Sequence, residues 1–238
     1  MKQTIQFYQG PSYECAYLDD QLATNIYPDP DIPMSNSLYS QLIQHGFRRS
    51  GDHAYRPYCG QCNACVPVRI NIRNFQPNRS QRRCLQRNQE IQLVSCPAKF
   101  KQEHYELYCR YQTARHTGGG MDNSTEDIYL NFLTSEWSNT RFIEFRLQQQ
   151  LLGVAVTDFV ADGGSAFYTF FEPEEHKRSI GTYAILQQIA VIQSLKMNWL
   201  YLGYWIEDCR KMSYKTDFSA VEGYIDRQWQ PLGKHKTL

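Results

Sequence analysis

Residues 151–171, Leu-Leu-Gly-Val-Ala-Val-Thr-Asp-Phe-Val-Ala-Asp-Gly-Gly-Ser-Ala-Phe-Tyr-Thr-Phe-Phe, carry the pattern that decides the fold. The aromatic and β-branched runs at 151–160 and 165–171 are typical of strands, and Asp162-Gly163-Gly164 between them is typical of a hairpin turn. A run of the same kind, 141–147, comes just before them. The sequence therefore predicts three consecutive strands joined by tight turns.

The residues after this hairpin show a helix pattern and then further strand patterns. A helix is predicted over 182–197, where Ile185, Ile189 and Ile192 fall on one stripe. The apolar run 199–205 predicts a buried strand, and 223–229 predicts another. Strands and helices in this order predict a fold of the α/β (α+β) class.

The first part of the chain contains smaller elements separated by turns. Ser35 is placed to cap a short helix that Gly46 ends, and 47–58 is predicted to be extended. Alternation of apolar and polar residues predicts a strand at 66–73. The remaining elements predicted are helices at 79–88, 100–116 and 124–134, with a loop at 117–120.

Three cysteines at C-x2-C-x2-C spacing, Cys59, Cys62 and Cys65, form the most informative motif of this part. Two-residue gaps let consecutive thiolates converge on one zinc ion or one iron–sulfur cluster. Cys15 is the best candidate for the fourth ligand, with Cys84 and His53 as substitutes. The alternative is a set of reduced thiols in a tight turn with no metal.

An arginine-rich stretch surrounds this motif. Between His53 and Gln89 the chain has no Asp or Glu. Arginine donates two parallel hydrogen bonds to a phosphate, so this stretch is predicted to bind RNA or another phosphate ligand, with a solvated cationic face as the alternative. The predicted tRNA contacts are Arg56, Arg69, Arg73, Arg79, Arg82 and Arg83.

Composition limits the class of protein. The 238 residues carry a net charge of +1, so a polyanion would have to meet a local patch. The amino terminus lacks the apolar core of a signal peptide, and no apolar run reaches the roughly 18 residues of a membrane span. We therefore expect a cytoplasmic protein with reduced cysteines and no membrane partner.

Several segments of the sequence resemble motifs of known families. The turn Arg178-Ser179-Ile180-Gly181-Thr182-Tyr183 resembles the phosphate-binding loop of GCN5-related N-acetyltransferases, with Tyr183 in place of a small residue. The cysteine block, together with 201–206 and 209–215, resembles the aminoacyl-tRNA–protein transferases of the N-end rule pathway, and the bacterial aspartate/glutamate leucyltransferases in particular. The likeness covers nearly the whole chain.

That resemblance implies a fold, an activity and two substrates. A cysteine-containing domain at 1–98 would pack on an acetyltransferase-like transfer domain at 99–238. Leucine would move from leucyl-tRNA to proteins that begin with Asp or Glu, without a cofactor for the transfer itself. The alternatives are an arginyl-tRNA–protein transferase, an acetyl-CoA-dependent N-acetyltransferase and a non-catalytic zinc-ribbon RNA-binding module.

The resemblance also suggests roles for individual residues. An aminoacyl ester is already activated, so the site needs a held amine and a weak base rather than a nucleophilic side chain. Asp158, on the strand expected to face the cleft, and Glu172 are the candidates for gripping the ammonium or taking its proton. The substrate-binding candidates are Gly181 and Thr182 of the loop, Tyr204 and Trp205 for the leucyl group or the terminal adenine, and Lys211, Lys215 and Arg178 for the acidic first residue.

Overall fold

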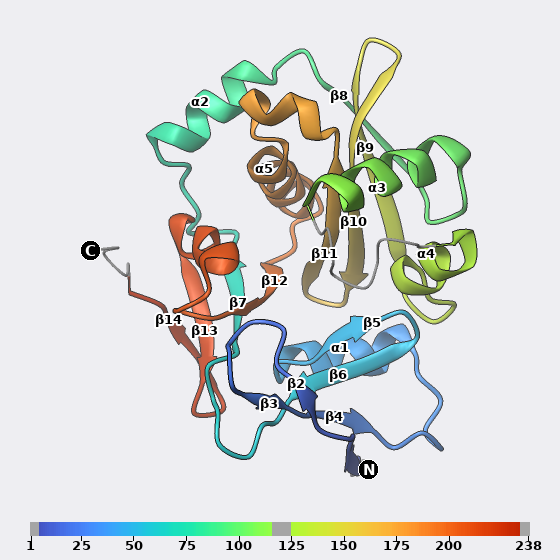
Figure 1. Ribbon diagram of the computed structural model, residues 1–238. Coiled ribbons are helices and arrows are strands. Elements are labelled where there is room, and N and C mark those ends of the chain that lie inside the picture. The colour runs from blue at the N-terminus through green and yellow to red at the C-terminus, as the bar shows by residue number, and fades with distance from the viewer. Residues whose placement is uncertain (1–4, 116–124, 234–238) are drawn as a thin grey trace.

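An eight-stranded sheet forms the centre of the computed structural model, which describes residues 5–115 and 125–233 (Figure 1). The strand order is β14-β13-β7-β12-β11-β10-β9-β8. The strands are β7 (Val66–Asn71), β8 (Gln92–Pro97), β9 (Thr140–Leu147), β10 (Gln150–Val160), β11 (Gly163–Phe171), β12 (Trp199–Trp205), β13 (Val221–Ile225) and β14 (Gln228–Pro231). Neighbouring strands are antiparallel except β11 and β12, which are parallel.

Helices cover both faces of this sheet. Successive residues of a strand point to opposite faces, so Val154 of β10 packs with α3 and α4 while Ala155 packs with α5. The helix α2 packs against α5. The bounds are α2 (Arg79–Arg87), α3 (Gln102–Arg115), α4 (Glu126–Leu133) and α5 (Ile180–Ser194), with 3-10 helical segments at Pro173–Arg178 and Arg210–Asp217.

A smaller sheet, drawn in blue, lies below the large one in Figure 1. Its order is β1 (Phe7–Gln9), β4 (Asn25–Pro28), β6 (His53–Pro57) and β5 (Arg48–Ser50); α1 (Asn36–Gln44) and the β2 (Tyr13–Glu14)–β3 (Leu22–Ala23) hairpin complete this part. The Ser35 side chain accepts a hydrogen bond from the Leu38 amide, which confirms the predicted cap of α1. Gly46 follows the helix at φ +83°, as its predicted role requires.

The α/β class is confirmed, and so are the three-strand run, the following helix and the strand at 199–205. The prediction of one strand at 223–229 is wrong, because Asp226 and Arg227 both adopt positive φ and form a tight turn between β13 and β14. Strand β8 has no clear signal in the sequence, since most of its residues are exposed at the edge of the sheet. The predicted loop at 117–120 lies outside the described residues.

Segments from both sides of residue 98 build the large sheet. β7 lies between β12 and β13, and β8 pairs with β9, so the cysteine-rich part of the chain contributes two strands to it. The division of the chain into 1–98 and 99–238 stays a prediction. Within residues 5–115 and 125–233, no helix combines the length and the hydrophobicity needed to cross a bilayer.

Candidate active site

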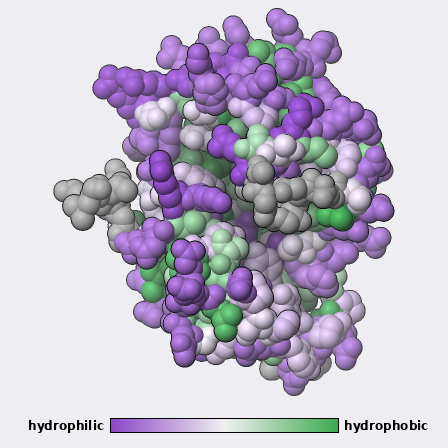
Figure 2. Space-filling view, in the orientation of Figure 1, coloured by the Kyte–Doolittle hydropathy of each residue, from purple (hydrophilic) through white to green (hydrophobic). Residues whose placement is uncertain are grey.

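The large sheet opens between its two parallel strands. β11 and β12 are paired only from Gly163 to Ser165 on one side and Trp199 to Tyr201 on the other, and both strands then continue apart. A cavity of about 390 Å³ occupies this opening, with Phe167 and Tyr168 on one wall and Leu202 and Tyr204 on the opposite wall. We call it the splay cavity. The face seen in Figure 2 is hollowed near its centre, where β11 and β12 diverge in Figure 1.

Arg48 of β5 holds the two strands at the point of divergence. Its guanidinium donates hydrogen bonds to the Ala166 carbonyl of β11 at 3.0 Å and to the Tyr201 carbonyl of β12 at 3.3 Å. Gly203 next to it adopts φ +85° at a bulge in β12, and a Cβ there would meet the guanidinium at 3.5 Å. The small sheet thus supplies a buried cation to the splay cavity.

Asp158 does not face the cleft, contrary to the sequence prediction. Its carboxylate is completely buried and accepts hydrogen bonds from Arg49 at 2.7 and 2.9 Å and from the Thr140 hydroxyl at 2.7 Å. Arg49 also donates to the Leu133 carbonyl. Because every one of these partners is structural, Asp158 is placed to tie β5, α4 and β10 together rather than to receive a substrate amine.

Lys215 and Tyr204 are the two predicted substrate-binding residues that the structure brings together. The Lys215 ammonium donates a hydrogen bond to the Tyr204 carbonyl, and both residues line the splay cavity. The Tyr204 hydroxyl donates to the Gly46 carbonyl at 2.9 Å. Burial, with a smaller effect of nearby Arg48, lowers the pKa of Lys215 to about 7.

The other predicted substrate-binding residues lie elsewhere. Trp205 is buried in the core on the α5 side of the sheet, and Lys211 is exposed and does not line the splay cavity. Arg178 pairs with Glu175 at 2.9 Å, while its carbonyl accepts from Asn88, just after α2. Gly181 and Thr182 lie in the first turn of α5 rather than in a loop, and this end of α5 follows the segment that contacts α2.

Glu172 stays a prediction as a catalytic carboxylate. It follows β11, is half-buried, and accepts from Arg110 of α3 at 3.1 Å. The Arg110 side chain is 52% exposed, so this pair is weak and can exchange with solvent.

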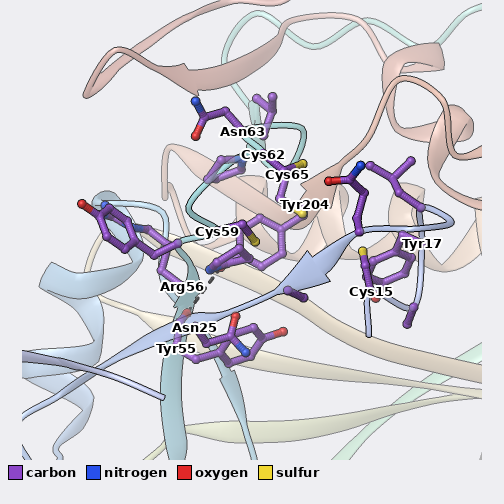
Figure 3. A pocket seen from close by; sticks show the side chains of 18 of the residues that line it. Cys15, Tyr17, Asn25, Tyr55, Arg56, Cys59, Cys62, Asn63, Cys65 and Tyr204 are labelled. Carbon is purple, nitrogen blue, oxygen red and sulfur yellow. Dashed lines mark hydrogen bonds between the residues drawn. The ribbon is translucent and has the colours of Figure 1, made fainter. Parts of the chain in front are cut away.

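All four predicted metal ligands line a second cavity, of about 780 Å³, beside the splay cavity. Figure 3 shows Cys15 of the β2–β3 loop across from the turn that carries Cys59, Cys62 and Cys65. Burial and then the nearby Cys59, Cys15 and Cys62 thiols raise the pKa of Cys65 to about 12. A bound cation would relieve this, because metal coordination removes the thiol protons.

These thiols are not gathered as closely as the four ligands of a tetrahedral zinc ion would be. Tetrahedral zinc with Zn–S bonds of about 2.3 Å brings its sulfurs to within about 3.8 Å of one another. In the part of the chain that the structure describes, the one group of three or more ligand-type side chains whose donor atoms all lie within 4.8 Å is elsewhere. All four thiols nevertheless line the same cavity.

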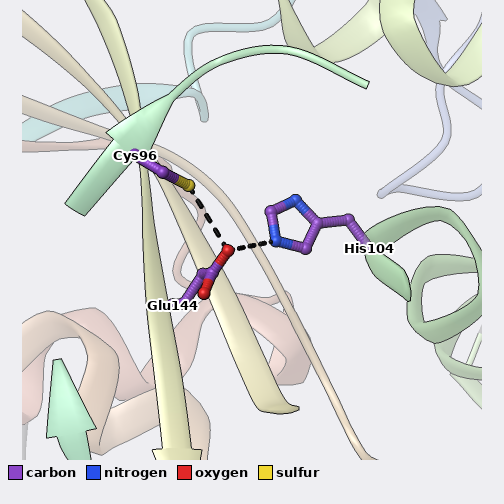
Figure 4. Close-up of side chains that lie close together, drawn as sticks. All are labelled: Cys96, His104 and Glu144. Carbon is purple, nitrogen blue, oxygen red and sulfur yellow. Dashed lines mark hydrogen bonds and ion pairs between the residues drawn. The ribbon is translucent and has the colours of Figure 1, made fainter. Parts of the chain in front are cut away.

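That tighter group is Cys96, His104 and Glu144, at the far side of the sheet (Figure 4). Glu144 Oε1 is 2.8 Å from His104 Nε2 and accepts from Lys101 at 2.6 Å, and its Oε2 accepts from Arg146 at 2.6 Å. Burial raises the pKa of Glu144, but the hydrogen bonds from Arg146, Lys101 and His104 outweigh this and lower it to about 2. The carboxylate is saturated by donors and cations, so the group is a structural network.

The predicted tRNA contacts fall into three environments. Arg79, Arg82 and Arg83 are exposed on α2, and Arg73 is exposed just after β7. Arg56 lines the cysteine cavity and donates to the His45 carbonyl at 2.9 Å.

Arg69 is not an exposed phosphate contact, which corrects the prediction. It is buried, pairs with Glu222 at 2.8 Å and lies 3.4 Å from the ring centroid of Trp199. A second ring, Trp229, covers it at 4.2 Å. Arg69 therefore anchors β7 to its neighbours in the sheet.

Arg48 and Arg49 both line the splay cavity, and sequence reasoning missed them. Adjacent residues of a strand point to opposite faces, so an arginine pair inside an extended segment directs at least one cation inward wherever either face is covered. Here both faces of β5 are covered and both guanidinium groups are buried. The arginine pair at the start of the predicted extended segment 47–58 is therefore the sequence signal that could have identified these buried cations.

Comparisons with known proteins identify the family of this chain. The family profile described as arginine-tRNA-protein transferase, N terminus, matches residues 13–83, and the profile for the C terminus matches residues 103–225. An aspartate/glutamate leucyltransferase from Nitrosococcus oceani is 48% identical over 96% of this chain and 96% of its own. One from Hahella chejuensis is also 48% identical, over 95% of this chain and 97% of its own. One from Saccharophagus degradans is 45% identical over 94% of this chain and 96% of its own. The chain belongs to the arginine-tRNA-protein transferase family.

Proposed function

We propose that this protein transfers leucine from leucyl-tRNA to the amino terminus of proteins that begin with Asp or Glu, and so marks them for N-end rule degradation. In this reaction the neutral amine attacks the ester carbonyl, a C–N bond forms and the bond to the ribose oxygen breaks. The nitrogen keeps one of its two protons and gives up the other to solvent or a weak base, and one proton is delivered in turn to the ribose oxygen, which leaves as a hydroxyl. Because charged tRNA is the donor, we also propose a cytoplasmic location.

The observation that carries the proposal is a pair of buried cations without a carboxylate partner in the splay cavity. Arg49 is neutralised by Asp158, but the polar partners found for Arg48 and Lys215 within the described residues are backbone carbonyls. None of the residues found to line this cavity is an Asp or Glu. Buried charges are normally paired, so the cavity is suited to a carboxylate from outside.

The walls of the same cavity favour leucine over arginine as the transferred residue. Phe132, Phe167, Leu202 and Met212 give it apolar walls. An arginyl side chain would meet two cations there with no described carboxylate to receive it, and like charges at close range in a buried site are costly. A leucyl side chain would instead bury its apolar surface against these walls, which is favourable.

Mass measurement of modified peptides tests the proposal. Peptides that begin with Asp, Asn and Lys are incubated with leucyl-tRNA, arginyl-tRNA or acetyl-CoA. We expect addition of leucine to the Asp peptide and to no comparable extent to the Asn or Lys peptides. Transfer of arginine, or of acetyl from acetyl-CoA, would replace the proposal with the corresponding alternative. RNA binding without any transfer would favour the non-catalytic RNA-binding module.

The exposed arginines of α2 are expected to contact tRNA phosphates. Replacing Arg79, Arg82 and Arg83 together by Ala should lower the slope of log affinity against log salt by about 0.9 for each duplex phosphate that the variant no longer neutralises. As a control, replacing two exposed lysines outside α2, Lys99 and Lys196, by Gln should leave the slope unchanged. Titrations of tRNA binding at several salt concentrations measure both. An unchanged slope in the triple variant would make this a solvated face.

We further propose that the four cavity cysteines bind an iron–sulfur cluster or zinc. Anaerobically purified protein should then hold iron or zinc, measured by elemental mass spectrometry, and Cys62→Ser should lose the metal and unfold at lower temperature, because ligand binding contributes to folding free energy. Cys109→Ser, at a half-buried cysteine outside this cavity, is the matched control. A metal-free parent that is folded and active would contradict the prediction.

A further inference from the structure

The cysteine cavity is joined to the splay cavity by a shared wall. Tyr17, Ser50, Tyr55 and Tyr204 line both. An aminoacyl group is esterified directly to the last ribose of its tRNA. If that group lies between β11 and β12, the terminal nucleotide must lie in an adjoining space, and the cysteine cavity is such a space.

The lining of the cysteine cavity is unusually rich in tyrosine. Tyr13, Tyr17 and Tyr58 are 48%, 50% and 58% exposed, so large aromatic surfaces face the cavity and solvent. Every base has a π-face, and stacking on aromatic side chains is the main attraction between proteins and unpaired bases. The cavity volume of about 780 Å³ is within the range of about 300 to 1,000 Å³ for sites that enclose a small ligand.

Polar groups around these rings suit a nucleotide. The side-chain amides of Asn25 and Asn63 line the cavity and can both donate to and accept from the edge of a base. Arg56 supplies a guanidinium for a phosphate. Figure 3 shows these polar groups on β4, β6 and the cysteine turn, with Tyr17 on the β2–β3 loop beside them, so several separate segments converge on one space.

We propose that this cavity binds the single-stranded 3′-terminal nucleotides of the aminoacyl-tRNA, with Tyr17 and Tyr58 stacking on the bases. The proposal rests on the proposed function, since it takes the aminoacyl group to lie in the splay cavity. Tyr17 lines both cavities and stacks on the last base, next to the ester. Tyr58 lies at the start of the cysteine turn and stacks on a base further from the ester.

Binding of two uncharged RNA hairpins tests this without any transfer reaction. One hairpin reproduces an acceptor stem with its single-stranded 3′ tail, and the other lacks the last two nucleotides. Tyr17→Ala and Tyr58→Ala should each weaken binding of the tailed hairpin by about 5- to 150-fold, the range expected when one base no longer stacks on an aromatic ring. Binding of the truncated hairpin should change less than about twofold, and Tyr→Phe at either position should restore binding of the tailed one.

Tyr8→Ala is the matched control, since Tyr8 is 51% exposed on β1 and lies outside this cavity. If both cavity variants bind the tailed hairpin as tightly as the parent does, the proposal is wrong. It is also wrong if they raise KM for the acceptor peptide and leave RNA binding unchanged, since the cavity would then hold the peptide chain. Absence of leucine transfer to Asp peptides by the parent protein would contradict the proposed function instead, and the hairpin assay does not depend on it.

Discussion

Asp158→Asn lowers the free energy of unfolding by about 3 to 5 kcal/mol, the range measured when one partner of a buried ion pair is removed. Asn has nearly the same shape as Asp but no charge, so the Arg49 guanidinium is left buried without its counter-ion. Arg49 also contacts the Phe167 ring at 4.0 Å and the Leu133 carbonyl, so the substitution weakens the junction between the small sheet and the large one. Urea titration followed by circular dichroism measures the change.

Glu172→Gln is the matched control for this prediction. Its partner Arg110 is half exposed, and such pairs contribute about 1 kcal/mol or less. The two variants also separate the roles predicted for these carboxylates. If Asp158→Asn keeps the parent's stability and loses transfer, Asp158 is a catalytic group after all. If Glu172→Gln keeps the parent's stability and loses transfer, the predicted catalytic role of Glu172 gains support.

The local elements could be predicted from sequence because their signals are local. Ser35 and Gly46 fix the two ends of α1 through chemistry within a few residues, and the alternation in 66–71 identifies β7 by itself. The position of β7 between β12 and β13 could not be predicted in this way. That placement depends on pairing with distant residues, Trp199–Trp205 and Val221–Gly223, which no periodicity in 66–71 encodes.

The same distinction explains which site residues sequence reasoning can find. Cys59, Cys62 and Cys65 are identifiable because their spacing is itself the signal, and Cys15 is added on ligand type. Arg69 resembles its exposed arginine neighbours in sequence because the residues that enclose it, Trp199 and Glu222, come from distant strands. Asp158 and Lys215 are both predicted from the sequence to bind substrate. Only the surrounding structure shows that Asp158 is neutralised by Arg49, whereas Lys215 is bonded to a backbone carbonyl.

Lys215 is expected to select acidic substrates in a pH-dependent way. Its pKa is about 7, so the side chain is a cation below this pH and becomes neutral above it. The Asp carboxylate needs the cation, whereas an Asn peptide presents nearly the same shape and amine without the charge. The ratio of kcat/KM for the Asp peptide to kcat/KM for the Asn peptide should therefore fall as pH rises through about 7. Taking the ratio cancels the titration of the attacking amine, which both peptides share.

Lys215→Met should remove this pH dependence and lower kcat/KM for the Asp peptide by about 10- to 150-fold, equivalent to the roughly 1.5 to 3 kcal/mol of a charge-assisted hydrogen bond. Lys211→Met, at an exposed lysine of the same segment, should leave both the pH dependence and kcat/KM close to the parent's.

The pH dependence of stability gives an independent check on Lys215. Its pKa in the folded protein lies below the ordinary value of 10.5, so the unfolded chain binds more protons between about pH 7 and 10.5. The free energy of unfolding that this group contributes therefore rises with pH across that window. Lys215→Met should flatten that rise. A variant whose stability no longer rises with pH and which nevertheless keeps the parent's preference for Asp over Asn would assign Lys215 to the fold and leave Arg48 as the cation that binds the acidic residue.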